Sequence, residues 1–191
     1  MNNAFQTRPA PGMSIRRLLV DDFFFQNVGA IPRGGVVIDI GGTKIKSGCF
    51  DISKYGFQVY CANISAAKGV DVVADGANLP FASACADAAI CAETLEHVPS
   101  PPAILAEGAR ILKTGGLFLA TAPFFYWQHA DPADYGRYTA QYWRENLARA
   151  GFCEIEAVAQ GGFWCVIADF LWYITLERAA CAVEFLKMMA A

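Results

Sequence analysis

The chain has 191 residues, enough for one domain with a substantial core, and it is globular in composition, with 55% hydrophobic and 17% charged residues. A formal net charge of −3 excludes the basic stripe of a general nucleic-acid binder, so no nucleic-acid partner is predicted. The seven cysteines form no Cys-x-x-Cys pair and the two histidines lack zinc-ligand spacing, which predicts no metal site. Scattered reduced cysteines and the missing signal-peptide pattern favour a cytoplasmic protein.

The N-terminal third is predicted to hold an arm, a helix and a buried strand. Residues 1–13 contain prolines and little periodicity, which favours a loose arm. Residues 14–26 place apolar side chains at near-helical spacing and predict a leading helix. The β-branched run from Val36 to Ile40, bounded by glycines, is typical of a buried parallel strand.

Strands and helices are predicted to alternate through the rest of the chain. Further strands are expected over residues 57–62, 70–74, 86–91 and 117–121, and helices over residues 102–112 and 142–150. The alternation predicts an α/β fold, a doubly wound and mostly parallel sheet.

The C-terminal region is predicted to form a hairpin and then a helix. Residues 152–158 and 163–167 flank Gly161-Gly162 and are expected to pair as antiparallel strands. Residues 164–189 continue as an apolar segment and an amphipathic helix, too interrupted by charge for a membrane span. Packing on the sheet or on a second copy in a homodimer is favoured over contact with a membrane surface.

A candidate ligand site begins at the end of the first strand, where the chain reads Asp39-Ile40-Gly41-Gly42. Ligands of open parallel sheets bind at the carboxyl ends of the strands, and glycines there let backbone amides approach a ligand closely. Alone, the motif also fits an ordinary turn ordered by an aspartate.

Three later blocks add to this motif: Asp75-Gly76-Ala77, the strand end Cys91-Ala92-Glu93-Thr94-Leu95-Glu96-His97, and Leu112-Lys113-Thr114-Gly115-Gly116. In this order, over roughly residues 35–160, the blocks resemble those of class I S-adenosylmethionine-dependent methyltransferases of the type 11 kind. The resemblance implies one methyltransferase domain over residues 1–191. It also implies a Rossmann-like sheet of seven strands ending in an antiparallel hairpin, and S-adenosylmethionine as cofactor with S-adenosylhomocysteine as product.

The resemblance also assigns roles to residues along the cofactor. Asp39, Gly41 and Gly42 would line its methionine end, and Asn63 would hold the ribose hydroxyls. Asp75, Gly76 and Ala77 would frame adenine, Cys91, Ala92 and Glu93 would face the reactive end, and His97 would lie nearby. The chain departs from the family pattern at Thr43 and Ile45, which replace two glycines, and at Asn63, which replaces an acid.

The loop after the fifth predicted strand is the candidate acceptor site. It is aromatic and resembles the His-x-x-Pro-x-Asp-x-x-Arg-Tyr-Thr loop of a bacterial methyltransferase subgroup, read here from His129 to Thr139. His129 is the candidate general base, Asp134 could orient it, and Arg137 could bind an acidic or phosphate group. Two alternatives stay open: a salt bridge between Asp134 and Arg137 that only fixes the loop, and methyl transfer by positioning without a base.

The predicted function is methyl transfer to a small-molecule, glycan or lipid-intermediate acceptor, whose accepting atom the sequence does not specify. A non-catalytic relative that serves as a binding subunit is the alternative that Thr43, Ile45 and Asn63 motivate. The motif from Asp39 to Lys44 also resembles the phosphate-binding opening of ROK sugar kinases, which need a longer, two-lobed chain.

Overall fold

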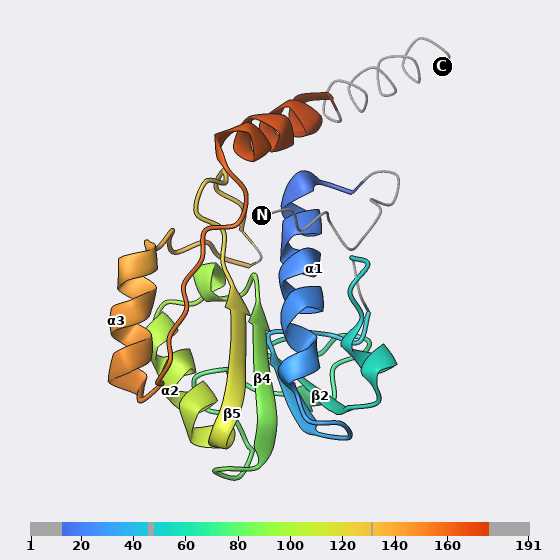
Figure 1. Cartoon of the computed structure of the whole chain (residues 1–191), viewed down its shortest axis with the longest axis vertical. Coiled ribbons are helices and arrows are strands. Elements are labelled where there is room, and N and C mark those ends of the chain that lie inside the picture. Colours follow the sequence, from blue (N-terminus) through green and yellow to red (C-terminus); the bar gives the residue numbers. More distant parts are fainter. Residues whose placement is uncertain (1–12, 46–47, 131, 176–191) are drawn as a thin grey trace.

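The computed structural model describes residues 13–45, 48–130 and 132–175, which form a five-stranded sheet with helices on both faces (Figure 1). All strand pairs are parallel, and the order across the sheet is β3-β2-β1-β4-β5. The strands are β1 (Val36–Ile40), β2 (Gln58–Asn63), β3 (Val72–Val73), β4 (Ala86–Ala92) and β5 (Leu112–Thr121). Because they run in the same direction, their carboxyl ends meet at one edge.

In the described part of the chain, three α-helices and three short 3-10 turns accompany the sheet, and a further helix spans residues 163–175. Those that accompany the sheet are α1 (Ile15–Asn27), η1 (Val28–Ala30), η2 (Ile52–Tyr55), η3 (Leu95–His97), α2 (Pro101–Ile111) and α3 (Ala140–Ala150). Side-chain oxygens begin two of the helices: Ser14 Oγ accepts from the backbone N–H of Arg17, and Thr139 Oγ1 accepts from that of Tyr142. Gly151, at φ 98°, ends α3 in the left-handed conformation that glycine favours.

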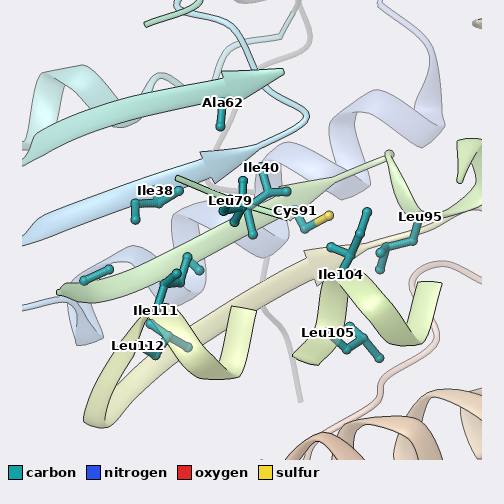
Figure 2. Packing of buried hydrophobic residues seen from close by; sticks show 12 residues of the cluster. Ile38, Ile40, Ala62, Leu79, Cys91, Leu95, Ile104, Leu105, Ile111 and Leu112 are labelled. Carbon is teal, nitrogen blue, oxygen red and sulfur yellow. The ribbon is translucent and has the colours of Figure 1, made fainter. Parts of the chain in front are cut away.

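The core has two layers because side chains alternate along the strands. Ile38 and Ile40 lie on one face of β1, where they belong to a cluster with Ile104 and Leu105 of α2 (Figure 2). Val37 lies on the other face, in a cluster that includes side chains of α1. Each fully buried Ile or Leu contributes about 1.5–3 kcal/mol relative to exposure. The two layers hold the sheet rigid beneath the loops at its carboxyl edge.

At the amino-terminal end of the sheet, the carboxylate of Asp87 connects three neighbouring strands. Asp87 Oδ2 accepts from the backbone N–H of Val36 at 2.8 Å, and its Oδ1 accepts from Lys113 Nζ at 2.7 Å. These contacts lower the pKa of Asp87, with the Lys113 hydrogen bond the larger cause and the Val36 N–H the second. Asp87 thus ties β4 to the first residue of β1 and to β5.

The predicted elements are confirmed from α1 to α3, with shifted ends. The predicted third strand shrinks to the two residues of β3, and β5 begins at Leu112, so Gly115-Gly116 lies inside that strand. Residues 1–12 of the predicted arm and 176–189 of the predicted C-terminal helix lie outside the described residues. Within the described ranges, no helix is long and apolar enough to span a bilayer.

The predicted antiparallel hairpin, and with it the seven-stranded sheet, is wrong. Residues 152–160 form no strand, and residues 163–175 are helical. Gly162 begins that helix, since its carbonyl accepts from the N–H groups of Cys165 and Val166. A short apolar run fits a strand or a buried helix equally well, and here Val166, Phe170 and Tyr173 repeat at helical spacing.

Candidate active site

The turn after β1 packs so tightly that it requires its two glycines. Gly41 has φ +81°, and a Cβ there would lie 2.5 Å from Thr94 Oγ1. A Cβ on Gly42 would overlap the carboxyl group of Asp39. The backbone N–H of Gly41 donates to Ala62 O at 2.7 Å, which joins the turn to β2. The turn therefore presents bare backbone at the carboxyl edge, as the sequence predicts.

A cavity lies beside this turn, between the sheet and α1. Its volume is about 170 Å³, and its walls include Asp39, Gly42 and Thr43 of the β1 end together with Arg17 and Asp21 of α1. Asp39 itself is buried, and Cys61 Sγ lies 4.0 Å from its Oδ2. Pockets for drug-sized ligands hold about 300–1,000 Å³, so this cavity fits one end of a large cofactor and leaves the rest along the open edge.

Asn63, Thr43 and Ile45, the three departures from the family pattern, form hydrogen bonds within the loops of this edge. Asn63 Nδ2 donates to Gly41 O at 2.7 Å, and its Oδ1 accepts from the N–H of Ser65 at 3.1 Å. Thr43 Oγ1 accepts from the N–H of Ile45 at 3.0 Å. Lys44 Nζ pairs with Asp71 at 2.5 Å, so neither Thr43 nor Lys44 is arranged around a phosphate.

The residues predicted to frame adenine follow β3. Asp75 is exposed, and its Oδ1 accepts from the N–H of Ala77 at 2.9 Å. A Cβ on Gly76 would lie 3.1 Å from atoms of Ile40 and Ile104, so the backbone here rests directly on β1 and α2. Asp75 is therefore held at the open edge, next to the β1 end.

The end of β4 contributes one core residue and one site residue. Cys91 is fully buried, and burial raises the pKa of its thiol, so this side chain belongs to the core rather than to a ligand surface. Ala92 lines the cavity. Glu93 has φ 50°, a left-handed conformation that only a few per cent of non-glycine residues adopt, and its N–H donates to Thr121 O at 2.9 Å.

Glu93 connects the end of β4 to α1. Its carboxylate forms an ion pair with Arg16, and the Arg16 guanidinium lies 4.2 Å from the ring centroid of Tyr126. The backbone N–H of Arg16 donates to Asp169, a buried residue of the helix over residues 163–175. Tyr173 of the same helix packs against Trp127 at 4.0 Å between ring centroids. Sequence motifs gave no signal for Arg16 or Asp169, because their partners are distant in the chain.

Glu96, His97 and His129 come together at the same edge, and the sequence did not single out Glu96. The rings of the two histidines are 4.9 Å apart and nearly perpendicular, at 84°. Nε2 of His97 lies 3.5 Å from Oε1 of Glu96, whose side chain is 0% exposed. Burial raises the pKa of Glu96. Burial also lowers the pKa of His129; the hydrogen bond with Trp127 O opposes this shift, and the nearby His97 increases it.

Asp134 and Arg137 form the salt bridge that the sequence left open as an alternative. Arg137 donates to both carboxylate oxygens of Asp134, at 2.5 and 2.7 Å. It also donates to Trp127 O at 2.9 Å, and Asp134 accepts from the backbone N–H of His129 at 2.8 Å. The Arg137 hydrogen bond holds the pKa of Asp134 well below its usual range. The pair fixes the loop, and Arg137 also borders an open hollow of about 300 Å³.

Comparison with known proteins supplies the family. Residues 41–120 match the model of a family described as "Methyltransferase domain". The predicted class I methyltransferase resemblance is thereby confirmed, while the subgroup suggested by the loop from His129 to Thr139 stays a prediction. No curated protein sequence matches the chain significantly.

Solved structures of methyltransferases share the fold of this chain. An S-adenosylmethionine-dependent methyltransferase from Aquifex aeolicus is 18% identical, with a TM-score of 0.57 over 76% of this chain and 87% of the other. The 1,6-didemethyltoxoflavin-N1-methyltransferase of Burkholderia thailandensis, solved with S-adenosylhomocysteine, is 17% identical, with a TM-score of 0.57 over 79% and 72% of the two chains.

A third structure is a complex between the Haloferax volcanii Trm112 methyltransferase activator and a putative methyltransferase. It matches at 19% identity, with a TM-score of 0.51 over 71% of this chain and 72% of the other. Identities this low establish a common fold. Together with the family match they support S-adenosylmethionine as the cofactor.

Proposed function

We propose that the protein is an S-adenosylmethionine-dependent methyltransferase that acts on a small-molecule, glycan or lipid-intermediate acceptor. The observation that carries the proposal is the bare-backbone turn of Gly41 and Gly42, which packs against Thr94 and Asp39 at the start of the matched segment. The exposed carboxylate of Asp75 and the half-buried Ala92 lie at the same carboxyl edge of the sheet. Such an edge is where open parallel sheets bind their ligands.

The residues present fit the cofactor with one adjustment. Asp39, Gly41 and Gly42 would hold its methionine end beside the cavity, and Asp75 with the backbone of Gly76 and Ala77 would hold adenine. Asn63 fits less directly, because its amide nitrogen already holds Gly41 O and its oxygen holds Ser65. When bound, the cofactor supplies a methyl group on a positively charged sulfur.

The acceptor is proposed to bind under the loop after β5. The aromatic side chains of Tyr126 and Trp127 and the hollow beside Arg137 give this loop apolar walls with a cationic border. Catalytic roles for His129, Asp134 and Arg137 stay predictions. The double hydrogen bond between Asp134 and Arg137 supports a positioning role for both, since it holds the backbone of His129.

A non-catalytic methyltransferase-like subunit is the second candidate, and the small cavity beside Thr43 favours it. The Haloferax volcanii complex concerns a methyltransferase activator, so a protein partner for this chain is part of that candidate. The kinase alternative has no support, because Lys44 is paired with Asp71 and the matched domain is a methyltransferase domain. A cytoplasmic location and a homodimer stay proposals from the sequence.

The proposal is tested by the thermal midpoint of unfolding with and without S-adenosylhomocysteine. A ligand that binds only the folded state raises the midpoint as its concentration rises. We expect such a rise for the wild-type chain, a smaller one for Asp75→Ala, and an unchanged one for Glu145→Ala. Glu145 is an exposed residue of α3, remote from the site. Equal shifts in all three chains, or none in the wild type, would contradict the proposed cofactor site.

A further inference from the structure

The cluster of Glu96, His97 and His129 has the composition and the compactness of a metal site. Each side chain offers one ligand atom, and these atoms lie within 4.8 Å of one another. Two residues come from η3 and one from the loop after β5, which explains why their spacing in sequence gave no metal signal. Two imidazoles and one carboxylate form a donor set that suits zinc, iron, cobalt or manganese ions.

Glu96 is an independent sign that a cation belongs there. Its side chain is 0% exposed, and neither carboxylate oxygen accepts a hydrogen bond from the residues that the structure describes. A buried carboxylate without hydrogen-bond partners or a bound cation is strongly unfavourable. The guanidinium groups of Arg16 and Arg137 lie close enough to favour the charged form of Glu96. Each is, however, paired directly with another carboxylate, Arg16 with Glu93 and Arg137 with Asp134.

The histidines are oriented as ligands usually are. His97 Nδ1 lies 2.5 Å from Ala133 O, and a carbonyl oxygen only accepts, so Nδ1 carries the proton. In the neutral ring Nε2 then has a free lone pair, and it is the nitrogen that lies 3.5 Å from Glu96. A metal-bound histidine almost always donates its other N–H to a carbonyl or a carboxylate.

His129 is fixed in a similar way by the loop around it. Its Nδ1 lies 3.4 Å from Trp127 O and 3.5 Å from Asp134 Oδ2, two acceptors, and also 3.4 Å from an Arg137 nitrogen. All three contacts are made by Nδ1, so Nε2 is the nitrogen assigned as the metal ligand. The Asp134–Arg137 salt bridge thus acts through the backbone and ring of His129.

We propose that Glu96, His97 and His129 bind one divalent first-row transition-metal cation. Three protein ligands leave at least one coordination position open. On the proposed function, that position holds an oxygen of the methyl acceptor, because the cluster lies between the end of β4 and the acceptor loop. His129 then serves as a ligand, and its nitrogen lone pair is not available for the role of general base.

The site is tested by metal binding to the full-length chain without cofactor or acceptor. Cobalt(II), whose visible absorption reports its ligands, and zinc(II), competed against a chromophoric chelator, are the probes. We expect one ion per chain, and at least about 100-fold weaker binding in Glu96→Gln and in His129→Ala. Losing an outer hydrogen-bond partner of a ligand already costs about 10–100-fold. Cys153→Ser, which removes an exposed thiol, controls for binding by cysteine and leaves the affinity unchanged.

Thermal unfolding first establishes that each variant is folded, and only folded variants are compared for metal affinity. If Glu96→Gln does not fold, His129→Ala, a substitution in a loop, still tests the site. Wild-type binding no tighter than that of His129→Ala, or binding that Cys153→Ser abolishes, would overturn the metal site. S-adenosylhomocysteine binding is measured on the same samples. The S-adenosylhomocysteine titration is carried out without added metal. Failure to bind the cofactor and failure to bind metal can therefore be told apart.

Discussion

At the scale of single residues, the candidate cofactor site depends on close packing around the turn after β1. Gly41 and Gly42 leave room for Thr94 and Asp39, and the sequence motif identified both glycines correctly as turn residues. The same motif could not reveal Glu96, whose carboxylate is buried and accepts no hydrogen bond from the described part of the chain. Burial follows from packing between distant segments, which a local sequence pattern does not encode.

Gly42→Ala is expected to destabilise the turn and to weaken cofactor binding. The added methyl group would overlap the Asp39 carboxyl group, and overpacking of this kind costs about 1–3 kcal/mol. Urea unfolding measures the loss of stability. Gly29→Ala is the matched control, because a Cβ there meets nothing within 4 Å. Equal stability of the two variants would contradict the tight packing of the turn.

At the scale of elements, local patterns sufficed where an element is regular and amphipathic. The leading helix, the strands β1, β2 and β4 and the helices α2 and α3 were predicted close to their observed ends. The C-terminal hairpin failed because residues 163–167 fit a strand and a helix equally well. The contact of Arg16 with Asp169 helps to decide between them, and its two residues are separated by 153 positions.

Arg16→Ala is expected to loosen the contact between α1, the β4 end and the helix over residues 163–175. The substitution leaves the Glu93 carboxylate without its ion pair and removes the cation from the face of Tyr126. We expect faster amide hydrogen exchange in residues 122–130 and 163–175. Arg149→Ala, at an exposed i,i+4 pair of α3, is the control with unchanged exchange. Unchanged exchange in Arg16→Ala would show that Arg16 does not hold these segments.

Asp87→Asn is expected to lower stability in a pH-dependent way. The folded-state pKa of Asp87 is lowered by Lys113 and by the Val36 N–H, so its contribution is present above the unfolded-state pKa of about 3.9. The contribution is lost as pH falls through the folded-state pKa. Free energies of unfolding from urea titrations should therefore differ by about 0.5–1.5 kcal/mol at pH 7 and converge in acid. A difference that stays constant down to the acid limit would be inconsistent with an ionised Asp87 clamp.

At the scale of the whole molecule, the parallel sheet brings four loops to one edge. The proposed cofactor and acceptor sites both lie at that edge. The turn after β1, Asp75 after β3, Glu93 after β4 and the loop after β5 are far apart in sequence and adjacent in the fold. The family blocks were enough to predict the Rossmann-like fold, and the position of the cofactor along its edge stays a prediction. The sequence also indicated the acceptor loop, but the cluster of Glu96, His97 and His129 depends on contacts between segments and required the structure.

The central claim is that this edge binds an adenosyl cofactor. Calorimetric titration of the folded wild-type chain with S-adenosylmethionine and with S-adenosylhomocysteine, with ATP as control, tests it most directly. We predict saturable binding of both adenosyl ligands at one site per chain and no binding of ATP. A folded chain that binds neither adenosyl ligand would contradict the enzyme assignment and favour the non-catalytic subunit.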